Sequence, residues 1–192
     1  MTQEQRTTLA LPKRFRKRSA PVGAIPGTLT VHASAQPSVL DQTFIGGARF
    51  EQIVGDQVDI TAEPSTGEVH WLNITGLADI DLLREVGAEF GLHDLTLEDV
   101  VNTDQRPNVD VQSDHMVIRT RMVRRPHDTD TDIVETEQVV MVLTGQHLLT
   151  FQEFDGDCFD PVRRRMGDGR PRMRSGDVGY IAYALLDAAI DS

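Results

Sequence analysis

Cysteine and long apolar runs are scarce in this sequence of 192 residues. The single cysteine, Cys158, allows no internal disulfide and no zinc site built from several thiolates. The longest apolar segments, residues 139–143 and 181–186, are far shorter than the ~20 residues that a membrane-spanning helix needs. The basic N-terminus lacks the apolar stretch of a secretory signal. We therefore expect a soluble chain in a reducing compartment.

The chain has little positive charge for its size. It contains 19 Lys and Arg against 30 Asp and Glu, which gives a net charge of −11. The first 20 residues hold six Lys and Arg and one Glu, so the remaining 172 residues carry −16. A body this acidic repels phosphate backbones, which argues against nucleic acid as the main partner. It also attracts cations to its surface.

Common enzymatic signatures are absent as well. The sequence has no G-x-x-x-x-G-K-[ST], G-x-G-x-x-G, H-E-x-x-H or G-x-S-x-G motif. The six histidines lie singly, so we interpret them as surface or strand residues rather than metal ligands. The carboxylates around Cys158 are expected to raise the pKa of its thiol, which argues against a nucleophilic role. We predict that the chain is not an enzyme.

Composition divides the chain into a tail and one domain. Residues 1–27 are rich in basic residues, Thr, Gln and Pro, and they are predicted to form a disordered, solvated tail. An alternative is an arm that lies on anionic lipid head groups. Residues 28–192 are predicted to form one globular domain, because their length and hydrophobic content suffice for a single core.

Hydrophobic periodicity predicts the elements of this domain. Strands are expected at residues 28–33, 50–60, 70–75, 115–123, 137–143 and 147–151. Helices are expected at residues 79–90, from 94 to the pair Arg106-Pro107, from 160 to 167, and from about 176 to the end. Strands that alternate with helices and then pair as hairpins indicate an α/β fold with a mixed sheet.

Capping and turn residues are predicted at the ends of these elements. Gly91 is expected to stop the first helix. Asp160 is expected to cap the third helix and Ser175 the last one. Residues 144–146 predict a tight hairpin connection, and residues 126–132 predict a polar hairpin loop.

Two pairs of carboxylates are the candidates for a functional site. On the final helix, Asp187 lies about 180° from Val178, opposite the apolar face, and Asp191 follows one turn later. Like charges at this spacing repel each other. They are therefore either solvated surface residues or groups that a cation or a partner segment neutralises. Glu98 and Asp99 are adjacent on the second helix, and each can supply one oxygen to a Mg²⁺ ion shared with another segment.

Seven motifs occur in a fixed order along residues 71–187. They are Trp71-Leu-Asn-Ile-Thr-Gly76, Phe90-Gly-Leu-His93, Leu97-Glu-Asp-Val100, Asn102-Thr-Asp-Gln-Arg-Pro107, Phe151-Gln-Glu153, Phe159-Asp-Pro-Val-Arg163 and Tyr183-Ala-Leu-Leu-Asp187. With these motifs, residues 28–192 resemble the cytoplasmic N-terminal domain of the CorA family of magnesium and cobalt transporters. The likeness is dense from Trp71 onward and loose between residues 33 and 69.

The resemblance implies an α/β/α sandwich with a central mixed sheet. It further implies a homopentameric channel in the cell (inner) membrane, in which this domain is cytoplasmic and senses divalent cations. The chain is expected to end before the stalk helix, the two membrane helices and the Gly-Met-Asn pore motif of the family. For the chain alone, we therefore expect a monomer or dimer.

The resemblance also implies which residues bind metal. In the family, regulatory sites lie between subunits, where carboxylates that match Glu98, Asp99 and Asp187 meet a stalk aspartate of the next subunit. Asp191 matches a further acidic position. The expected ligand is Mg²⁺, and also Co²⁺, bound weakly so that the sites can empty when the ion becomes scarce. Because the stalk aspartate is not in this chain, each site is expected to be incomplete.

Three alternatives remain at this point. The first is the cytoplasmic domain of a related zinc transporter of the ZntB type. The second, from a different class, is a soluble metal-dependent hydrolase that uses the same carboxylates, although no histidine ligand cluster or nucleophile–base pair supports it. The third is an oligomerisation domain without any role in ion binding.

Overall fold

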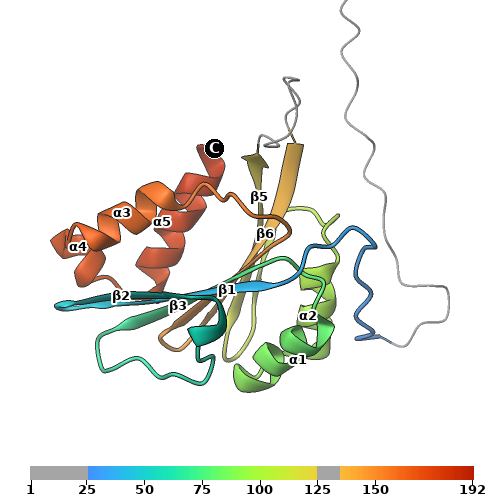
Figure 1. The fold of residues 1–192 in the computed structure, drawn as a ribbon, viewed down its shortest axis with the longest axis horizontal. Coiled ribbons are helices and arrows are strands. Elements are labelled where there is room, and N and C mark those ends of the chain that lie inside the picture. Colours follow the sequence, from blue (N-terminus) through green and yellow to red (C-terminus); the bar gives the residue numbers. More distant parts are fainter. Residues whose placement is uncertain (1–25, 125–134) are drawn as a thin grey trace, which may run out of the picture.

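The computed structural model describes residues 26–124 and 135–192. In these two stretches, seven strands form one sheet in the order β2-β1-β3-β7-β6-β5-β4 (Figure 1). The strands are β1 (Val39–Gly46), β2 (Arg49–Val54), β3 (Val69–Thr75), β4 (Asn108–Val111), β5 (Met116–Arg124), β6 (Glu135–Thr144) and β7 (His147–Gln152). The helices are α1 (Ile80–Glu89), α2 (Asp94–Val101), α3 (Asp160–Gly167), α4 (Pro171–Arg174) and α5 (Val178–Ile190), with a 3-10 turn η1 (Gly55–Gln57).

One parallel pair of strands lies at the centre of the sheet. β3 and β7 run in the same direction, with His70 opposite His147. The other neighbouring strands pair antiparallel, so the predicted mixed sheet is confirmed. A two-residue turn joins β6 to β7, as predicted for residues 144–146. Gly145 in this turn has a φ of +55°, a backbone conformation that favours glycine.

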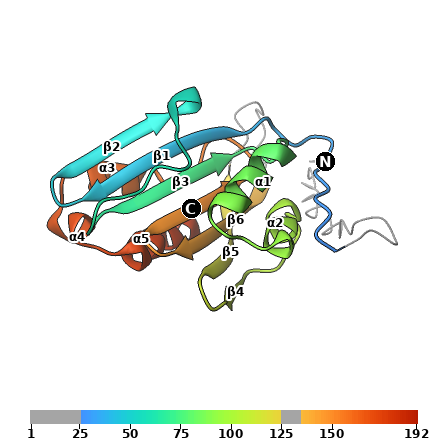
Figure 2. The ribbon, with the colours of Figure 1, turned by 90° about the horizontal axis from the view of Figure 1, so that it is seen from below.

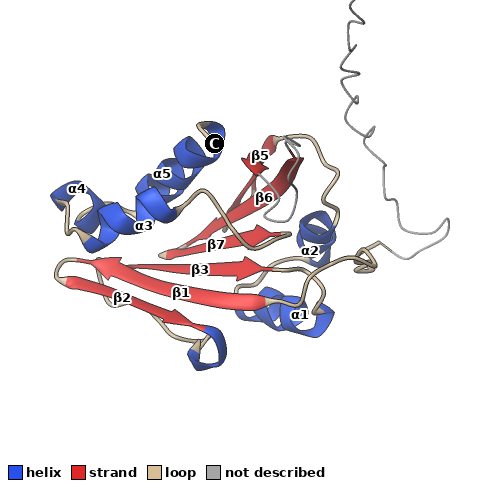
Figure 3. Ribbon diagram, turned by 45° about the horizontal axis from the view of Figure 1, so that its top comes forward, coloured by secondary structure: helices blue, strands red, loops and turns tan. Residues whose placement is uncertain are grey.

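Helices cover both faces of the sheet. α3, α4 and α5 lie on one face, and α1 and α2 lie on the other (Figures 1 and 3). Figure 2 shows the side that α1 and α2 cover. The predicted α/β/α sandwich is therefore confirmed.

The central strands bury side chains on both faces. On β3, Leu72 and Ile74 belong to the core under α1 and α2, whereas Val69 and Trp71 belong to the core under α3 to α5. Successive residues of a strand point to opposite faces, so a strand covered on both sides carries apolar residues on both faces, here beside the buried polar residues His70 and Asn73. The apolar segments at 70–75 and 137–143 were sufficient to predict such strands.

Several predicted elements are confirmed to within about two residues. α1 has Asp79 as its N-cap, and the Oδ1 atom of Asp79 accepts the N–H of Leu82 at 3.0 Å. Gly91 follows the helix with a φ of +65°, as expected for a helix stop. The strands predicted at 70–75, 115–123, 137–143 and 147–151 correspond to β3, β5, β6 and β7.

Residues 28–33 do not form a strand, so this prediction was wrong. The segment has no regular secondary structure. Leu29 is buried and Val31 is partly buried, both against the core under α1 and α2. The alternation therefore reflects an irregular segment that packs on a helical layer, where no neighbouring strand is needed.

The predicted caps of the last two long helices are corrected. Asp177, rather than Ser175, caps α5, because its Oδ1 atom accepts the N–H of Tyr180 at 2.9 Å. The hydroxyl of Ser175 instead donates to the carbonyl of Pro171. α3 begins with Asp160 inside its first turn, and the preceding residue occupies the N-cap position.

Other boundaries were missed by the prediction. β1, β4 and α4 were not expected, β2 ends at Val54 rather than near residue 60, and α2 ends at Val101 before the Arg106-Pro107 pair. Most of the predicted tail and the polar loop predicted at 126–132 lie outside the described residues.

Candidate functional site

α2 positions the first carboxylate pair at the edge of one helical layer. Leu97 on the inner face of α2 contacts Gly87 of α1 so closely that a Cβ atom at this glycine would lie 2.6 Å from the leucine Cδ1. This packing leaves Glu98 and Asp99 half-buried. Glu98 accepts the backbone N–H of Gly27 at 2.8 Å through Oε2. One oxygen of Glu98 therefore anchors the irregular N-terminal segment.

Asp99 already has two partners within the chain. One carboxylate oxygen forms an ion pair with the guanidinium of Arg119, and the other accepts a hydrogen bond from the side-chain amide of Gln105. The Arg119 side chain is only 5% exposed, and it also donates to Oδ1 of Asn108 at 2.7 Å. No sequence pattern indicates this pairing, because Arg119 lies on β5, 20 residues from Asp99.

α5 presents the second pair to solvent. Its buried residues include Ile181 and Leu185, and Asp187 is exposed on the other side, as the periodicity predicted. Asp191 is also exposed, and its backbone N–H donates to the carbonyl of Asp187 at 3.0 Å. Among the described residues, no ion pair involves Asp187 or Asp191. Their charges also oppose the dipole at the C-terminal end of α5.

The two pairs lie in different layers of the molecule. α2 and α5 pack on opposite faces of the sheet, so the fold separates Glu98 and Asp99 from Asp187 and Asp191 (Figures 1 and 3). Within residues 26–124 and 135–192, no group of three or more His, Cys, Asp or Glu is placed to hold a metal ion. Carboxylate oxygens are suitable ligands for Mg²⁺. One chain, however, offers only two separate pairs of them, Glu98 with Asp99 and Asp187 with Asp191.

A buried polar network connects three of the sequence motifs. Asn73 of β3 accepts hydrogen bonds at 2.6 Å from the Thr150 hydroxyl and from the Gln152 amide, both on β7. The same amide lies 3.3 Å from Oδ2 of Asp157, which in turn accepts from Arg163. The motif residues at positions 73, 152 and 163 therefore tie β3, β7 and α3 together.

Arg163 neutralises Asp157 at the end of this network. Its two terminal nitrogens each donate to Asp157 at 2.6 Å, and its guanidinium lies 5.0 Å from the ring centroid of Trp71. Burial by itself would raise the pKa of Asp157, but the hydrogen bonds and charge of Arg163 outweigh it and lower this pKa. At Asp41, burial prevails over a 3.7 Å contact with Arg163, and the pKa is raised.

The network borders an open cleft of about 700 Å³. Its lining comes from β1, β2, β3, α3 and the loop before α3, and it includes Asp41, Gln52, Asn73, Asp157 and Arg163. The cleft lies at the carboxyl end of β3, where α/β sheets often bind ligands. Here, however, the charge of Arg163 is already paired with Asp157 and lies close to Asp41.

Two glutamates whose pKa values are raised were not singled out from the sequence. Glu137 of β6 is 1% exposed, and burial, reinforced by the nearby charge of Glu153, raises its pKa to about 8. Burial also raises the pKa of Glu153. Glu153 ends one of the seven motifs and Glu137 begins a predicted strand, but neither pattern indicates that the carboxylate is desolvated in the fold.

The structure gives no support to nucleophilic chemistry at Cys158. Burial and then the charge of Asp157 raise the pKa of its thiol to about 11, in the direction expected from the sequence. His70 is buried on β3, where it stacks on Phe44, and burial lowers its pKa to about 4. His70 is therefore a strand residue packed in the core, as interpreted from the sequence.

No helix in the described part of the chain has both the length and the apolar character that crossing a bilayer requires. Residues 67–192 match the family described as CorA-like Mg²⁺ transporter protein. The chain is 40% identical over 121 residues to the cobalt/magnesium transport protein CorA of Thermotoga maritima. This match covers 63% of the chain and 34% of that protein, so the chain spans about a third of its relative.

Solved structures show the same fold. The soluble domain of CorA from Methanocaldococcus jannaschii superposes with a TM-score of 0.57 at 12% identity, over 80% of this chain and 56% of that one. The cytoplasmic domain of ZntB from Vibrio parahaemolyticus superposes with a TM-score of 0.56 at 8% identity, over 78% of this chain and 57% of that one. These identities are low, so the likeness establishes the architecture alone.

The matched family consists of transporters and not of enzymes, which supports the prediction that the chain is not an enzyme. The seven motifs lie within the matched residues. Because the match covers well over half of the sequence, this chain belongs to the family of CorA-like Mg²⁺ transporter proteins.

Proposed function

We propose that this chain is the cytoplasmic divalent-cation-sensing domain of a CorA-type magnesium and cobalt transporter. The carboxylates come from Asp187 and Asp191 on α5 and from Glu98 and Asp99 on α2. At each site, carboxylates of two neighbouring subunits bind the same hydrated Mg²⁺ or Co²⁺ ion. Membership of the family supports the transport role. The placement of the two pairs in opposite layers supports sites between chains rather than within one.

The exposure of Asp187 carries the proposal. Asp187 lies on the outer face of α5, one turn from Asp191, and forms no ion pair among the described residues. Such a carboxylate gains most from a cation that is bound between assembled subunits. Mg²⁺ keeps several waters and is often held by one or two carboxylates, which suits such an open position.

Repulsion between subunits provides the physical link to gating. When the ion is bound, it offsets the repulsion between carboxylates on facing subunits and holds a homopentamer closed. When the ion concentration falls, the uncompensated charges favour separation and an open pore. Two states with different ion affinity are all that such coupling requires. The affinity must be weak, roughly in the 10⁻⁴–10⁻³ M range of loose divalent-cation sites, because a tight site would never empty.

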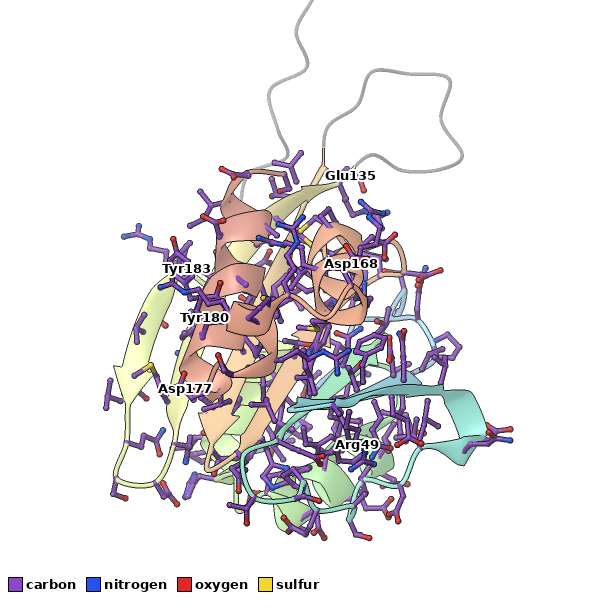
Figure 4. All side chains as sticks on the ribbon, turned by 90° about the vertical axis from the view of Figure 1, so that its left-hand side faces the viewer. Arg49, Glu135, Asp168, Asp177, Tyr180 and Tyr183 are labelled. Atoms are coloured by element: carbon purple, nitrogen blue, oxygen red, sulfur yellow. The ribbon has the colours of Figure 1, made fainter. Side chains whose placement is uncertain are left out.

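The test uses a protein that carries this chain together with the stalk and membrane helices, in the inner membrane or in liposomes. Asp187→Asn is expected to raise by about tenfold the internal Mg²⁺ concentration that half-closes the channel. Asp168→Asn on the exposed end of α3 is the matched control, since it makes the same charge change elsewhere in the same layer (Figure 4). Equal Mg²⁺ dependence in both variants would contradict the proposal.

A second candidate is the cytoplasmic domain of a ZntB-type zinc transporter, because a ZntB cytoplasmic domain shares this architecture. Ion flux separates the two candidates. Mg²⁺ or Co²⁺ uptake that is blocked by internal Mg²⁺ supports the magnesium branch, whereas uptake of Zn²⁺ without such a block supports the zinc branch.

A further inference from the structure

A buried guanidinium lies directly beneath one of the proposed ligands. Arg119 projects from β5 on the face that α2 covers, and its side chain is only 5% exposed. One terminal nitrogen pairs with Oδ2 of Asp99, and the other donates to Asn108 on the neighbouring strand β4 at 2.7 Å. The arginine is thus held from both sides and has little freedom to turn away.

The carboxylate of Asp99 is engaged on both oxygens. Arg119 takes Oδ2 and the amide of Gln105 takes Oδ1. Each carboxylate oxygen has a further lone pair, and the Asp99 side chain is 38% exposed, so its outer side can still accept a ligand. A divalent ion would therefore meet a carboxylate whose charge is already balanced by an arginine within hydrogen-bonding distance.

Arginine is a permanent competitor in this position. A guanidinium stays protonated at every physiological pH, so proton loss does not relieve its repulsion of a second cation. Because the group is buried, water and salt screen this repulsion less than they would at the surface. Removing the carboxylate from its arginine is also costly, since the buried positive charge would be left unpaired.

We propose that Arg119 is an internal cation that weakens divalent-cation binding at Asp99 and thereby sets the concentration range of the sensor. This inference rests on the proposed function, because it concerns the affinity of one of the proposed ligands. Asp187, by contrast, has no arginine partner among the described residues. The two half-sites of the chain are therefore unequal. Asp187 on α5 has no arginine partner among the described residues, whereas Asp99 on α2 is paired with the guanidinium of Arg119 on β5.

The test is an NMR titration of the 192-residue chain with MgCl₂, followed through the backbone amide of residue 99. Arg119→Met is expected to bind Mg²⁺ about tenfold more tightly than the unmodified chain. Arg119→Lys retains the charge and is expected to stay within about twofold of it. Arg84→Met removes an equal charge from an exposed site on α1, in the same helical layer, and is expected to change the affinity little.

Two further measurements make the outcome decisive. Adding Asp99→Asn to Arg119→Met is expected to abolish the gain. In the unmodified chain, the guanidinium signals of Arg119 are expected to shift together with the residue 99 amide, which tests the competition even if Arg119→Met is unstable.

Equal affinity in the Met and Lys variants, or no shift at residue 99 in any of them, would overturn the inference. That result would leave the Asp187→Asn test of the transporter untouched. Conversely, a gain in Arg119→Met combined with unchanged gating in Asp187→Asn would contradict the proposed function and not the competition by Arg119.

Discussion

Arg163 connects side chains from three parts of the fold. Its guanidinium is bound to Asp157 in the loop before α3, lies 3.7 Å from Oδ2 of Asp41 on β1, and contacts Asp160 at 3.2 Å. It is the last residue of one of the seven motifs. Its role in this structure is to offset part of the charge of two partly buried carboxylates, Asp41 and Asp157, next to the cleft.

Loss of this arginine is therefore expected to be costly. In Arg163→Met, Asp157 and Asp41 lose their shared cation, and we expect the free energy of unfolding to fall by about 3 kcal/mol. Urea unfolding measures this change. Arg164→Met, which replaces an exposed arginine on the same helix, should change the stability by less than about 0.5 kcal/mol. Similar losses in the two variants would show that Arg163 acts only through the net charge.

Glu137 is expected to make the fold sensitive to pH. Burial and Glu153 raise its pKa to about 8 in the folded chain, against an ordinary value of 4.5, although Arg124 lies 3.8 Å away. Between these two pH values the folded state binds more protons than the unfolded state. Stability contributed by this group is therefore complete below about pH 4.5 and is lost as the pH rises towards 8.

Glu137→Gln removes this dependence while conserving shape. Relative to the unmodified chain, the variant is expected to gain roughly 3 kcal/mol of stability between pH 5 and pH 8. Urea unfolding at several pH values in this range measures the difference. Glu135→Gln, at an exposed position of the same strand, serves as the control and should show no such trend. A constant difference across the range would contradict a raised pKa at Glu137.

At the residue scale, sequence reasoning identified candidate ligands but not their surroundings. The exposure of Asp187 followed from helical periodicity, which depends only on neighbours along the chain. The pairing of Asp99 with Arg119 depends on a contact between α2 and β5. Periodicity along the chain does not predict such a contact. From the sequence, Asp99 and Asp187 were therefore both predicted as metal ligands, with no difference in their surroundings.

At the element scale, α5 shows how a cap decides where a helix begins. Asp177 and Ser175 are both common N-cap residues, and only the structure shows that Asp177 accepts the Tyr180 N–H. Asp177→Ala is expected to lower the free energy of unfolding by about 1 kcal/mol, because that N–H loses its acceptor. Thermal or urea unfolding measures the loss.

Ser175→Ala separates the two assignments. The Ser175 hydroxyl bonds to a carbonyl of α4 and not to α5, so this variant is expected to lose less stability than Asp177→Ala. A larger loss of stability in Ser175→Ala than in Asp177→Ala would indicate that Ser175 caps α5.

β1 and β4 escaped prediction for different reasons. β1 buries polar residues at its centre, including Gln42, whose Oε1 atom accepts the N–H of Asp59 at 3.0 Å. This breaks the simple alternation expected of a half-buried strand. β4 is a four-residue edge strand with every residue exposed, and the alternation of its two valines with polar residues is too short to distinguish it from a loop. Its pairing with β5 comes from the backbone.

At the scale of the whole molecule, separated half-sites predict weak metal binding by this chain alone. Millimolar Mg²⁺ is expected to raise its melting temperature by no more than about 1 °C, because a ligand well below its Kd adds little stability. A protein that also carries the stalk is expected to gain several degrees. Differential scanning calorimetry of both proteins measures the contrast, and a large rise in the short chain would show that one chain suffices.

The sequence by itself determined the α/β class, most of the central strands, α1 and the order of the family motifs. These depend on local periodicity, on capping and turn residues, and on buried strands that must be apolar on both faces. Only the tertiary structure decided that the carboxylate pairs lie in different layers, that Arg119 forms an ion pair with Asp99, and that Glu137 is buried 3.8 Å from Arg124. Such features arise from contacts between segments distant in the chain, and desolvation and charge pairing act only once those contacts form.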